Sequence, residues 1–281
     1  MERTSYPYDT VDMAGMHIDG SCLQEAQWAV ETNQTDILTQ ERYDKAQEAL
    51  AEAAVKGYTY VPLTQVPAAQ RITEAHIREE LPPGVFVATK GRALDVLSPD
   101  RAVAVVGTRN ISYYGRETVE RIVKGLRDTI LVTSFSFGVA HAAIQAALQN
   151  KVPVIAVVAT GPGECYPPGL RGLMETVSST RGCAVVTPFF PHTDPTPWHF
   201  LYRNRITALL ADKVIVAESK MKGGAMVTAR LAKSFGKDVY AVPGRINDIS
   251  SYGCNQLIAE GTADIWLPWG ENAPAQENAV E

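Results

Sequence analysis

The stretch HFLYRNRITALLADKVIVAES (residues 199–219) indicates the fold class, because it joins two kinds of apolar pattern in one short run. Its first half has the apolar spacing of an amphipathic helix and predicts a helix over residues 203–211. Its second half is a continuous apolar run of strand length and predicts a buried strand at Val214–Ala217. A helix that leads directly into a buried strand is typical of parallel sheets.

The same alternation extends along the chain on both sides of this stretch, beginning near residue 101. Further strands are predicted at Ala102–Val106, Ile130–Thr133, Val154–Val158, Ala184–Thr187 and Val239–Ala241. Helices are predicted at about 115–127, 138–149, 170–178, 225–235 and 253–260. The pattern indicates an α/β fold with a mostly parallel sheet. Because such sheets bind ligands at the carboxyl ends of their strands, the loops that follow the strands are the places to search for a site.

The first part of the chain follows a different pattern. Residues 21–56 are predicted to be helical, with Thr39 as the N-cap and Gly57 as the stop signal. Prolines between Val61 and Gly84 predict a domain boundary, and PPGVFVATKG (82–91) predicts a short strand. We therefore expect a helical N-terminal region (1–80), a sheet domain (81–268) and a disordered acidic C-terminal tail (269–281).

Charge is distributed unevenly along the chain, although the formal net charge is −5. Residues 1–100 carry 8 Lys and Arg against 16 Asp and Glu, whereas residues 199–245 carry 9 against 3. The net charge alone argues against a nucleic-acid-binding protein, but the basic segment around Arg203 and Arg205 favours an anionic ligand.

Four loops after predicted strands carry glycine or basic residues. VGTRN (106–110) offers a close backbone approach, a hydroxyl group and a guanidinium, next to a helix N-terminus whose N–H groups attract anions. ESKMKGGAMVTAR (218–230) places two lysines and a glycine pair before a helix, and VPGR (242–245) adds another arginine. ATGPGECYPPG (159–169) is a rigid turn that presents an aromatic ring for stacking. Each loop alone fits an ordinary turn, but together they predict an anion site. Its candidate residues are Gly107, Thr108, Arg109, Tyr166, Arg203, Asn204, Arg205, Lys220, Lys222, Gly223 and Gly224.

Features of an enzyme or a metalloprotein are missing from the sequence. The five histidines form no catalytic or metal-binding motif, and His199 is expected to pack or stack rather than act as a base. No G-x-G-x-x-G spacing supports a dinucleotide, so we expect no cofactor and no catalysis. Scattered cysteines and the lack of a signal sequence or apolar span predict a reduced, cytoplasmic protein. The cysteines are Cys22, Cys165, Cys183 and Cys254.

Six sequence blocks in order resemble the DprA/Smf family of DNA-processing proteins over about residues 80–267. They are GTR (107–109), YP (166–167), F-x-x-RNR (200–205), KGGAMVTA (222–229), GKDVYAVPG (236–244) and GCNQLIAEG (253–261). The resemblance implies an extended Rossmann-like, doubly wound domain that binds single-stranded DNA in a basic pocket without chemistry. It also implies a homodimer that helps to load a RecA-type recombinase in natural transformation.

Carried over to this chain, the family pattern adds Ser134, Gly138 and Thr228 to the candidate site. The chain departs from the pattern in two places: Ala140 and Ile144 replace an Asp and a His, and Pro188 replaces a Glu. We expect no winged-helix module after residue 268 and an N-terminal region that is short for the family, so a divergent member is expected.

The alternative is a nucleotide-binding or nucleotide-hydrolysing protein related to the lysine-decarboxylase-like phosphoribohydrolases. Those proteins carry P-G-G-x-G-T-x-x-E, with a catalytic glutamate. The nearest match here, KGGAMVTAR (222–230), has no glutamate at that place, which favours DNA binding.

Overall fold

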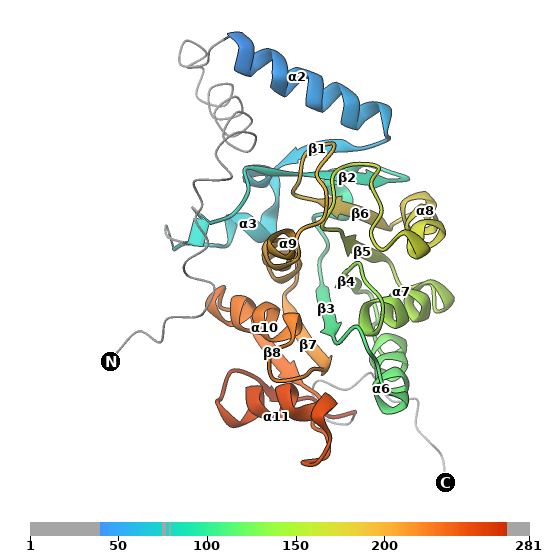
Figure 1. Cartoon of the computed structure of the whole chain (residues 1–281), viewed down its shortest axis with the longest axis vertical. Helices are drawn as coiled ribbons and strands as arrows, with labels where there is room; N and C mark the ends of the chain where they lie inside the picture. Colours follow the sequence, from blue (N-terminus) through green and yellow to red (C-terminus); the bar gives the residue numbers. More distant parts are fainter. Residues whose placement is uncertain (1–39, 75–76, 79, 269–281) are drawn as a thin grey trace. The chain divides into compact units, whose positions relative to one another are not determined.

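A computed structural model describes residues 40–74, 77–78 and 80–268 of the chain (Figure 1). The chain divides into two compact units, residues 1–52 and 53–281. Helix α2 (Gln40–Val55) crosses this division and is closed by Gly57, as predicted. Gly57 has a φ of 80°, and the N–H groups of Gly57 and Tyr58 donate to the last turn of the helix. The predicted N-cap Thr39 and residues 21–38 lie outside the described part.

Nine strands of the described part form one sheet in the order β1-β2-β6-β5-β4-β3-β7-β8-β9. Along this order, every pair of neighbouring strands from β6 through β5, β4, β3, β7 and β8 to β9 is parallel. Strand β2 is antiparallel to both β1 and β6. This order is a doubly wound, mostly parallel Rossmann-like sheet, which confirms the predicted fold class. The strands are β1 (Thr59–Pro62), β2 (Gly84–Thr89), β3 (Ala102–Gly107), β4 (Ile130–Ser134), β5 (Val154–Val157), β6 (Ala184–Thr187), β7 (Lys213–Glu218), β8 (Asp238–Ala241) and β9 (Asp264–Ile265).

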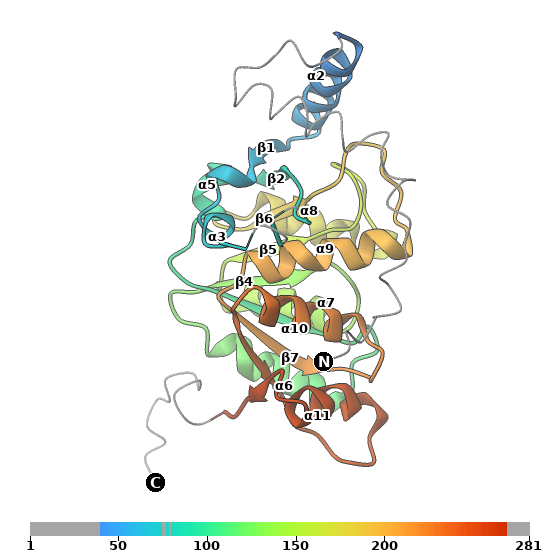
Figure 2. The same ribbon diagram turned by 90° about the vertical axis from the view of Figure 1, so that its left-hand side faces the viewer.

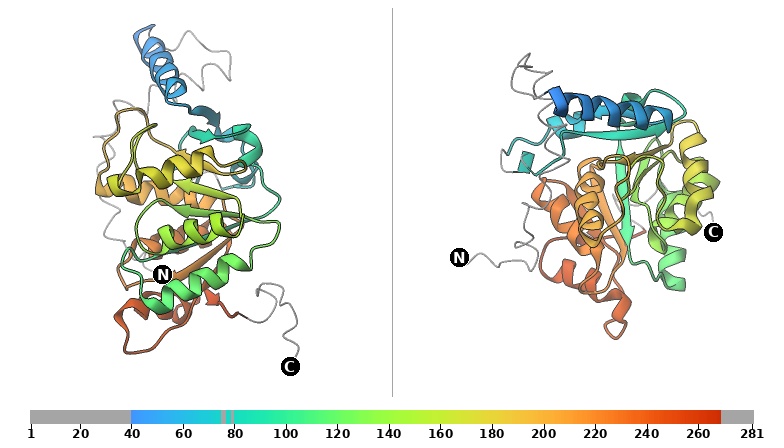
Figure 3. Two further views of the ribbon diagram at one scale, coloured as in Figure 1. Left: turned by 90° about the vertical axis from the view of Figure 1, so that its right-hand side faces the viewer. Right: turned by 45° about the horizontal axis from the view of Figure 1, so that its top comes forward.

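Helices cover both faces of the sheet (Figure 2). One face carries α6 (Tyr113–Lys124), α7 (Val139–Gln149) and α8 (Arg171–Ser179), which stand in the foreground of the left view of Figure 3. The opposite face carries α9 (Pro197–Leu209), α10 (Gly224–Ser234) and α11 (Tyr252–Ala259). Shorter helices are η3 (Leu63–Gln65), α3 (Pro67–Gln70), α5 (Ala93–Val96), η4 (Pro168–Leu170) and η5 (Ile249–Ser251).

The core lies between the sheet and its helices. Alternate strand residues such as Ala104 of β3 and Ile155 of β5 are fully buried and pack with Leu209 of α9 and Met226 of α10. Burial of one such large side chain contributes roughly 1.5–3 kcal/mol to folding. The neighbouring strand residues, Val105 among them, are also buried, so the central strands have no polar face. The continuous apolar runs in the sequence therefore predicted these strands well.

Helix α9 is where the prediction was wrong. It begins at Pro197 and ends at Leu209, rather than spanning residues 203–211. Thr196 is its N-cap, and the side chain of His199 completes a capping box with it. Together with proline at the first helical position, these caps start the helix almost two turns before the apolar spacing begins. The other predicted helices of the sheet domain agree with the structure to within one turn.

The N-terminal part of the sheet differs from the expected domain division. Strand β1 lies within residues predicted as a helical region, yet it pairs with β2. The unit that contains the sheet begins at Ala53, so residues 53–80 belong with the sheet rather than with the preceding residues. The prolines of this stretch mark the end of β1 and the start of α3 rather than a boundary. None of the described helices is long and apolar enough to cross a bilayer.

Candidate functional site

The sheet reverses its winding between β3 and β7, which are parallel neighbours. After β3 the chain turns to α6 on one face, and after β7 it turns to α10 on the opposite face. The backbone N–H of Thr108 donates to the carbonyl oxygen of Glu218 at 2.7 Å and joins the two strand ends. Ligands of doubly wound sheets bind at such a point, beyond the carboxyl ends of the strands.

The loop after β3 is held in place by the loop after β4. Gly138, the N-cap of α7, has φ 79° and ψ −129°, a backbone conformation that is open to glycine almost alone. A Cβ atom at Gly138 would collide with the carbonyl oxygen of Thr108 and with the backbone of Arg109. The N–H of Val139 donates to that same oxygen of Thr108 at 3.0 Å. The candidate residues Gly138, Thr108 and Arg109 are therefore brought together.

An aromatic ring of α9 is the centre of the site. The guanidinium of Arg109 lies over the ring of Phe200, 4.7 Å from its centroid, and that of Arg203 lies 5.9 Å from the same centroid. The ring of Tyr166 lies 5.6 Å from that of Phe200. Arg109 and Tyr166 are exposed, whereas Phe200 is half-buried. We call these four residues the Phe200 cluster.

Arg203 is the buried member of the Phe200 cluster. Its side chain is 3% exposed, and its Nη1 atom donates to the carbonyl oxygen of Val157 at the end of β5. Its Nε atom is buried without a hydrogen-bond partner in the described residues. Burial, and then the charge of Arg109, lower the pKa of Arg203 to about 9, so it stays protonated at neutral pH. A buried cation beside a second cation is costly, and an anion bound next to them would offset that cost. Arg203 was predicted as a direct phosphate contact, but its burial makes it a support for the site.

The start of α10, which follows β7, contacts α9. Its N-cap is Gly223, and no side chain caps it. The buried side chain of Asn204 donates to the carbonyl oxygen of Gly224 at 3.4 Å and so fastens the start of α10 to α9. The buried hydroxyl of Thr228, within α10, donates to the same oxygen at 3.4 Å. Lys220 and Lys222 in the same loop are exposed. Asn204 and Thr228 were predicted to contact the ligand, but in this structure they position the backbone.

Arg205 points away from the Phe200 cluster. Its guanidinium donates to Glu80 at 2.9 Å and lies 5.4 Å from the centroid of Tyr202. Arg203 and Arg205 are two positions apart on a helix, which puts them on different sides of it. Ser134, the last residue of β4, is half-buried and pairs with Val157 of β5.

Arg205→Ala is accordingly expected to change ligand affinity by less than about twofold and the free energy of unfolding by less than about 1 kcal/mol, because its ion pair is partly exposed. Binding and urea titrations of the variant check this. A tenfold loss of affinity would show that Arg205 belongs to the site.

The N-terminus of α6 is already occupied by an acidic side chain. The N–H of Ser112 donates to Oε2 of Glu218 at 2.9 Å, and the hydroxyl of Ser112 accepts from the N–H of Gly115 at 3.0 Å. Glu218 is 2% exposed, and a Cβ atom at Gly115 would collide with its carboxylate. Two of the N–H groups that this helix start was predicted to offer to a ligand, those of Ser112 and Gly115, therefore already have partners within the chain. Glu218 ends an apolar strand, and its sequence context did not reveal its position opposite α6.

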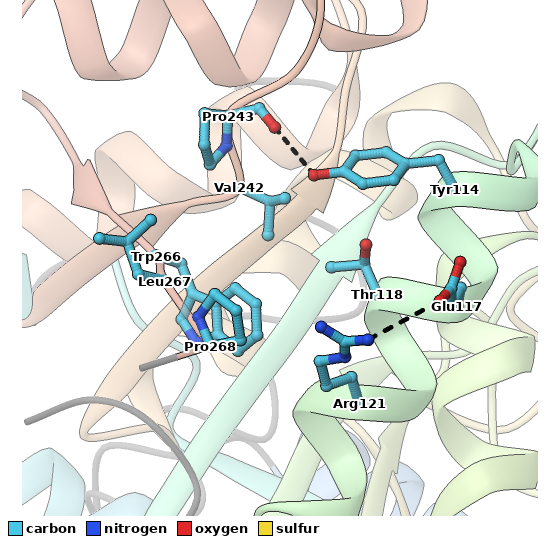
Figure 4. A pocket seen from close by; sticks show the side chains of 9 residues that line it. All are labelled: Tyr114, Glu117, Thr118, Arg121, Val242, Pro243, Trp266, Leu267 and Pro268. Carbon is cyan, nitrogen blue, oxygen red and sulfur yellow. Dashed lines mark hydrogen bonds and ion pairs between the residues drawn. The ribbon is translucent and has the colours of Figure 1, made fainter. Parts of the chain in front are cut away.

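A pocket of about 270 Å³ lies apart from this cluster, between α6 and the chain that follows β8 and β9 (Figure 4). The hydroxyl of Tyr114 donates to the carbonyl oxygen of Pro243 at 3.1 Å, and Arg121 pairs with Glu117 on its rim. The pocket contains none of the candidate residues. Its lining is Tyr114, Glu117, Thr118, Arg121, Val242, Pro243, Trp266, Leu267 and Pro268.

Titratable side chains outside the cluster have structural roles. His199 belongs to the capping box of α9, and its ring lies 4.5 Å from that of Phe189, in agreement with its expected packing role. Cys165, Cys183 and Cys254 are free and buried, and burial raises the pKa of Cys254 to about 12. In the described ranges no three His, Cys, Asp or Glu side chains gather as a metal site.

Comparison with known proteins gives a family match. The family model described as DNA recombination-mediator protein A matches residues 70–271. DNA processing protein DprA of Streptococcus pneumoniae is 41% identical over 160 residues, which cover 57% of this chain and 56% of that protein. The Bacillus subtilis DprA is 33% identical over 187 residues, which cover 66% and 62% of the two chains. The aligned part thus spans less than two thirds of either relative.

Solved structures agree with the sequence match. The X-ray structure of DprA from Streptococcus pneumoniae has a TM-score of 0.70 at 29% identity, and the likeness covers 88% of this chain and 89% of that one. DprA from Helicobacter pylori has a TM-score of 0.62 at 22% identity over 75% of this chain and 92% of that one, a likeness of fold.

Proposed function

The chain belongs to the DNA recombination-mediator protein A family, and from this premise we propose that it binds single-stranded DNA at the carboxyl edge of its sheet, as a DNA-processing protein. The observation that carries the proposal is the position of Arg109 over Phe200 beside the exposed ring of Tyr166. A cation next to aromatic rings suits a strand that offers a phosphate and an unstacked base. The solved structure of DprA from Helicobacter pylori is described by its single-stranded DNA binding mode, and this supports single-stranded DNA as the ligand here.

In this proposal phosphates are held by exposed groups, and buried groups position them. Arg109 contacts a phosphate directly, with Lys220 and Lys222 alongside it, and the uncapped start of α10 at Gly223 offers backbone N–H groups. The charge of Arg203 adds to the field without contact. Since phosphate contacts carry no base information, binding depends little on sequence.

Three further expectations stay predictions from family membership: the homodimer, the engagement of a RecA-type recombinase, and natural transformation as the pathway. A cytoplasmic location stays a prediction from the sequence. Binding in this proposal involves no chemistry on the DNA.

A salt series tests the proposal. With about three phosphates neutralised, the affinity for labelled oligothymidine is expected to fall roughly 20-fold from about 50 mM to about 200 mM salt. Fluorescence anisotropy measures it. If no binding is detected at the lowest salt, the proposed function is wrong.

A further inference from the structure

Phe137 is a large apolar side chain that the fold leaves exposed. It lies in the turn between β4 and α7, and its side chain is 48% exposed, whereas that of Phe135 two positions earlier is 1% exposed and belongs to the core. The Phe137 ring meets His141 at 6.4 Å with an interplanar angle of 82°. One exposed aromatic residue is unremarkable in itself, so its position decides whether it has a function.

The position of Phe137 is fixed next to Arg109. The residue that follows it, Gly138, packs against the backbone of Thr108 and Arg109 so closely that a Cβ atom would collide there. On the other side, a Cβ atom at Gly169 would lie 3.7 Å from Cζ of Phe137, so the ring borders the loop that carries Tyr166. Phe137 therefore lies between the loop of Arg109 and the loop of Tyr166.

Phe137 and Phe200 approach Arg109 from opposite faces of the sheet. Phe200 belongs to α9 on one face, and Phe137 directly precedes α7 on the other (Figures 2 and 3). The loop of Arg109 lies between them, because it contacts the ring of Phe200 and the backbone of Gly138. The loop of Arg109 thus has an aromatic residue on each of its two sides.

A histidine ring and a nearby arginine belong to the surroundings of Phe137. His141 lies against the ring, and Arg116 on the neighbouring α6 is exposed. Burial lowers the pKa of His141, and the positive charge of Arg116 lowers it further. A cationic side chain beside an exposed ring complements a nucleic-acid strand better than an apolar protein surface.

We propose that Phe137 is a stacking platform for a base of the same single strand whose phosphate Arg109 holds. The inference rests on the proposed function and extends it. One base meets the Tyr166 and Phe200 side of Arg109, another meets Phe137, and the strand passes over the loops of β5, β4 and β3 with Arg116 near its path. The ligand is then a strand with at least two neighbouring unstacked bases.

The test compares oligothymidine with an abasic strand of equal length, which keeps the phosphates and lacks the bases. Phe137→Ala is expected to weaken binding of oligothymidine by roughly 5- to 100-fold and to change binding of the abasic strand by less than about twofold. Phe137→Trp is expected to retain or strengthen binding of oligothymidine. Val55→Ala, which trims an exposed side chain at the end of α2, is the matched control and should change neither.

Three outcomes would overturn the inference. Equal losses for both strands in Phe137→Ala would assign Phe137 a structural role. Unchanged binding of oligothymidine in that variant, together with a loss in Arg109→Ala, would leave the proposed function standing and assign Phe137 to another partner. If the wild-type protein binds neither strand, the proposed function fails together with the inference.

Discussion

Arg109→Ala is expected to weaken the affinity for single-stranded DNA by about 10- to 100-fold, since it removes a charge-assisted contact with a phosphate. The salt dependence should also flatten, with the slope of log K against log salt reduced by about 0.7. The free energy of unfolding should change little, because Arg109 is exposed. Anisotropy titrations at several salt concentrations measure both effects.

Arg101→Ala is the matched control for this variant. Arg101 is also exposed and directly precedes β3, so it lies at the amino end of the strand whose carboxyl end leads to Arg109. Both variants lose one positive charge, but only Arg109 lies beside the Phe200 ring. Equal losses of affinity in the two variants would indicate a general charge effect and contradict a site at the carboxyl edge.

Gly138→Ala is expected to lower the free energy of unfolding by roughly 2–4 kcal/mol. The alanine would have to adopt a strained backbone conformation, and its Cβ atom would collide with the loop of Arg109. The affinity for single-stranded DNA should also fall, because the loop of Thr108 and Arg109 must shift. We expect a loss of tenfold or more, which corresponds to at least about 1.4 kcal/mol of binding free energy. Urea unfolding and anisotropy titration of the folded variant separate the two effects.

Gly57→Ala provides the control for backbone strain alone. Gly57 has almost the same φ, 80°, but a Cβ atom there would meet nothing within 4 Å. Its substitution should cost only about 1–2 kcal/mol and leave DNA affinity unchanged. If Gly138→Ala behaves like Gly57→Ala in both assays, the loop of Arg109 does not depend on Gly138.

The sheet was predictable from the sequence because its central strands are buried on both faces. Runs such as the one at Val154–Val157 must be apolar at every position, and this pattern is hard to mistake. Strand β1 was missed because it is short, half-buried and ends in Pro62. The start of α9 was missed because Thr196 and His199 define it through a hydrogen-bonded cap, which lies outside the apolar pattern.

The site was predictable in its location but not in its contacts. The carboxyl ends of parallel strands meet at one edge, so the loops with Arg109, Tyr166 and Lys222 could be assigned to that edge without coordinates. Which side chains face outward depends on packing between distant segments. The burial of Arg203 against Val157 and the occupation of the α6 N-terminus by Glu218 are contacts of that kind.

A competition experiment tests whether the protein prefers single-stranded to duplex DNA. A labelled oligothymidine bound to the wild-type protein is displaced either by unlabelled single-stranded DNA or by the same sequence as a duplex. We expect the single strand to compete at a concentration at least about tenfold lower, because the aromatic side chains of the proposed site need unstacked bases that a duplex does not offer. Equal or stronger competition by the duplex would contradict it.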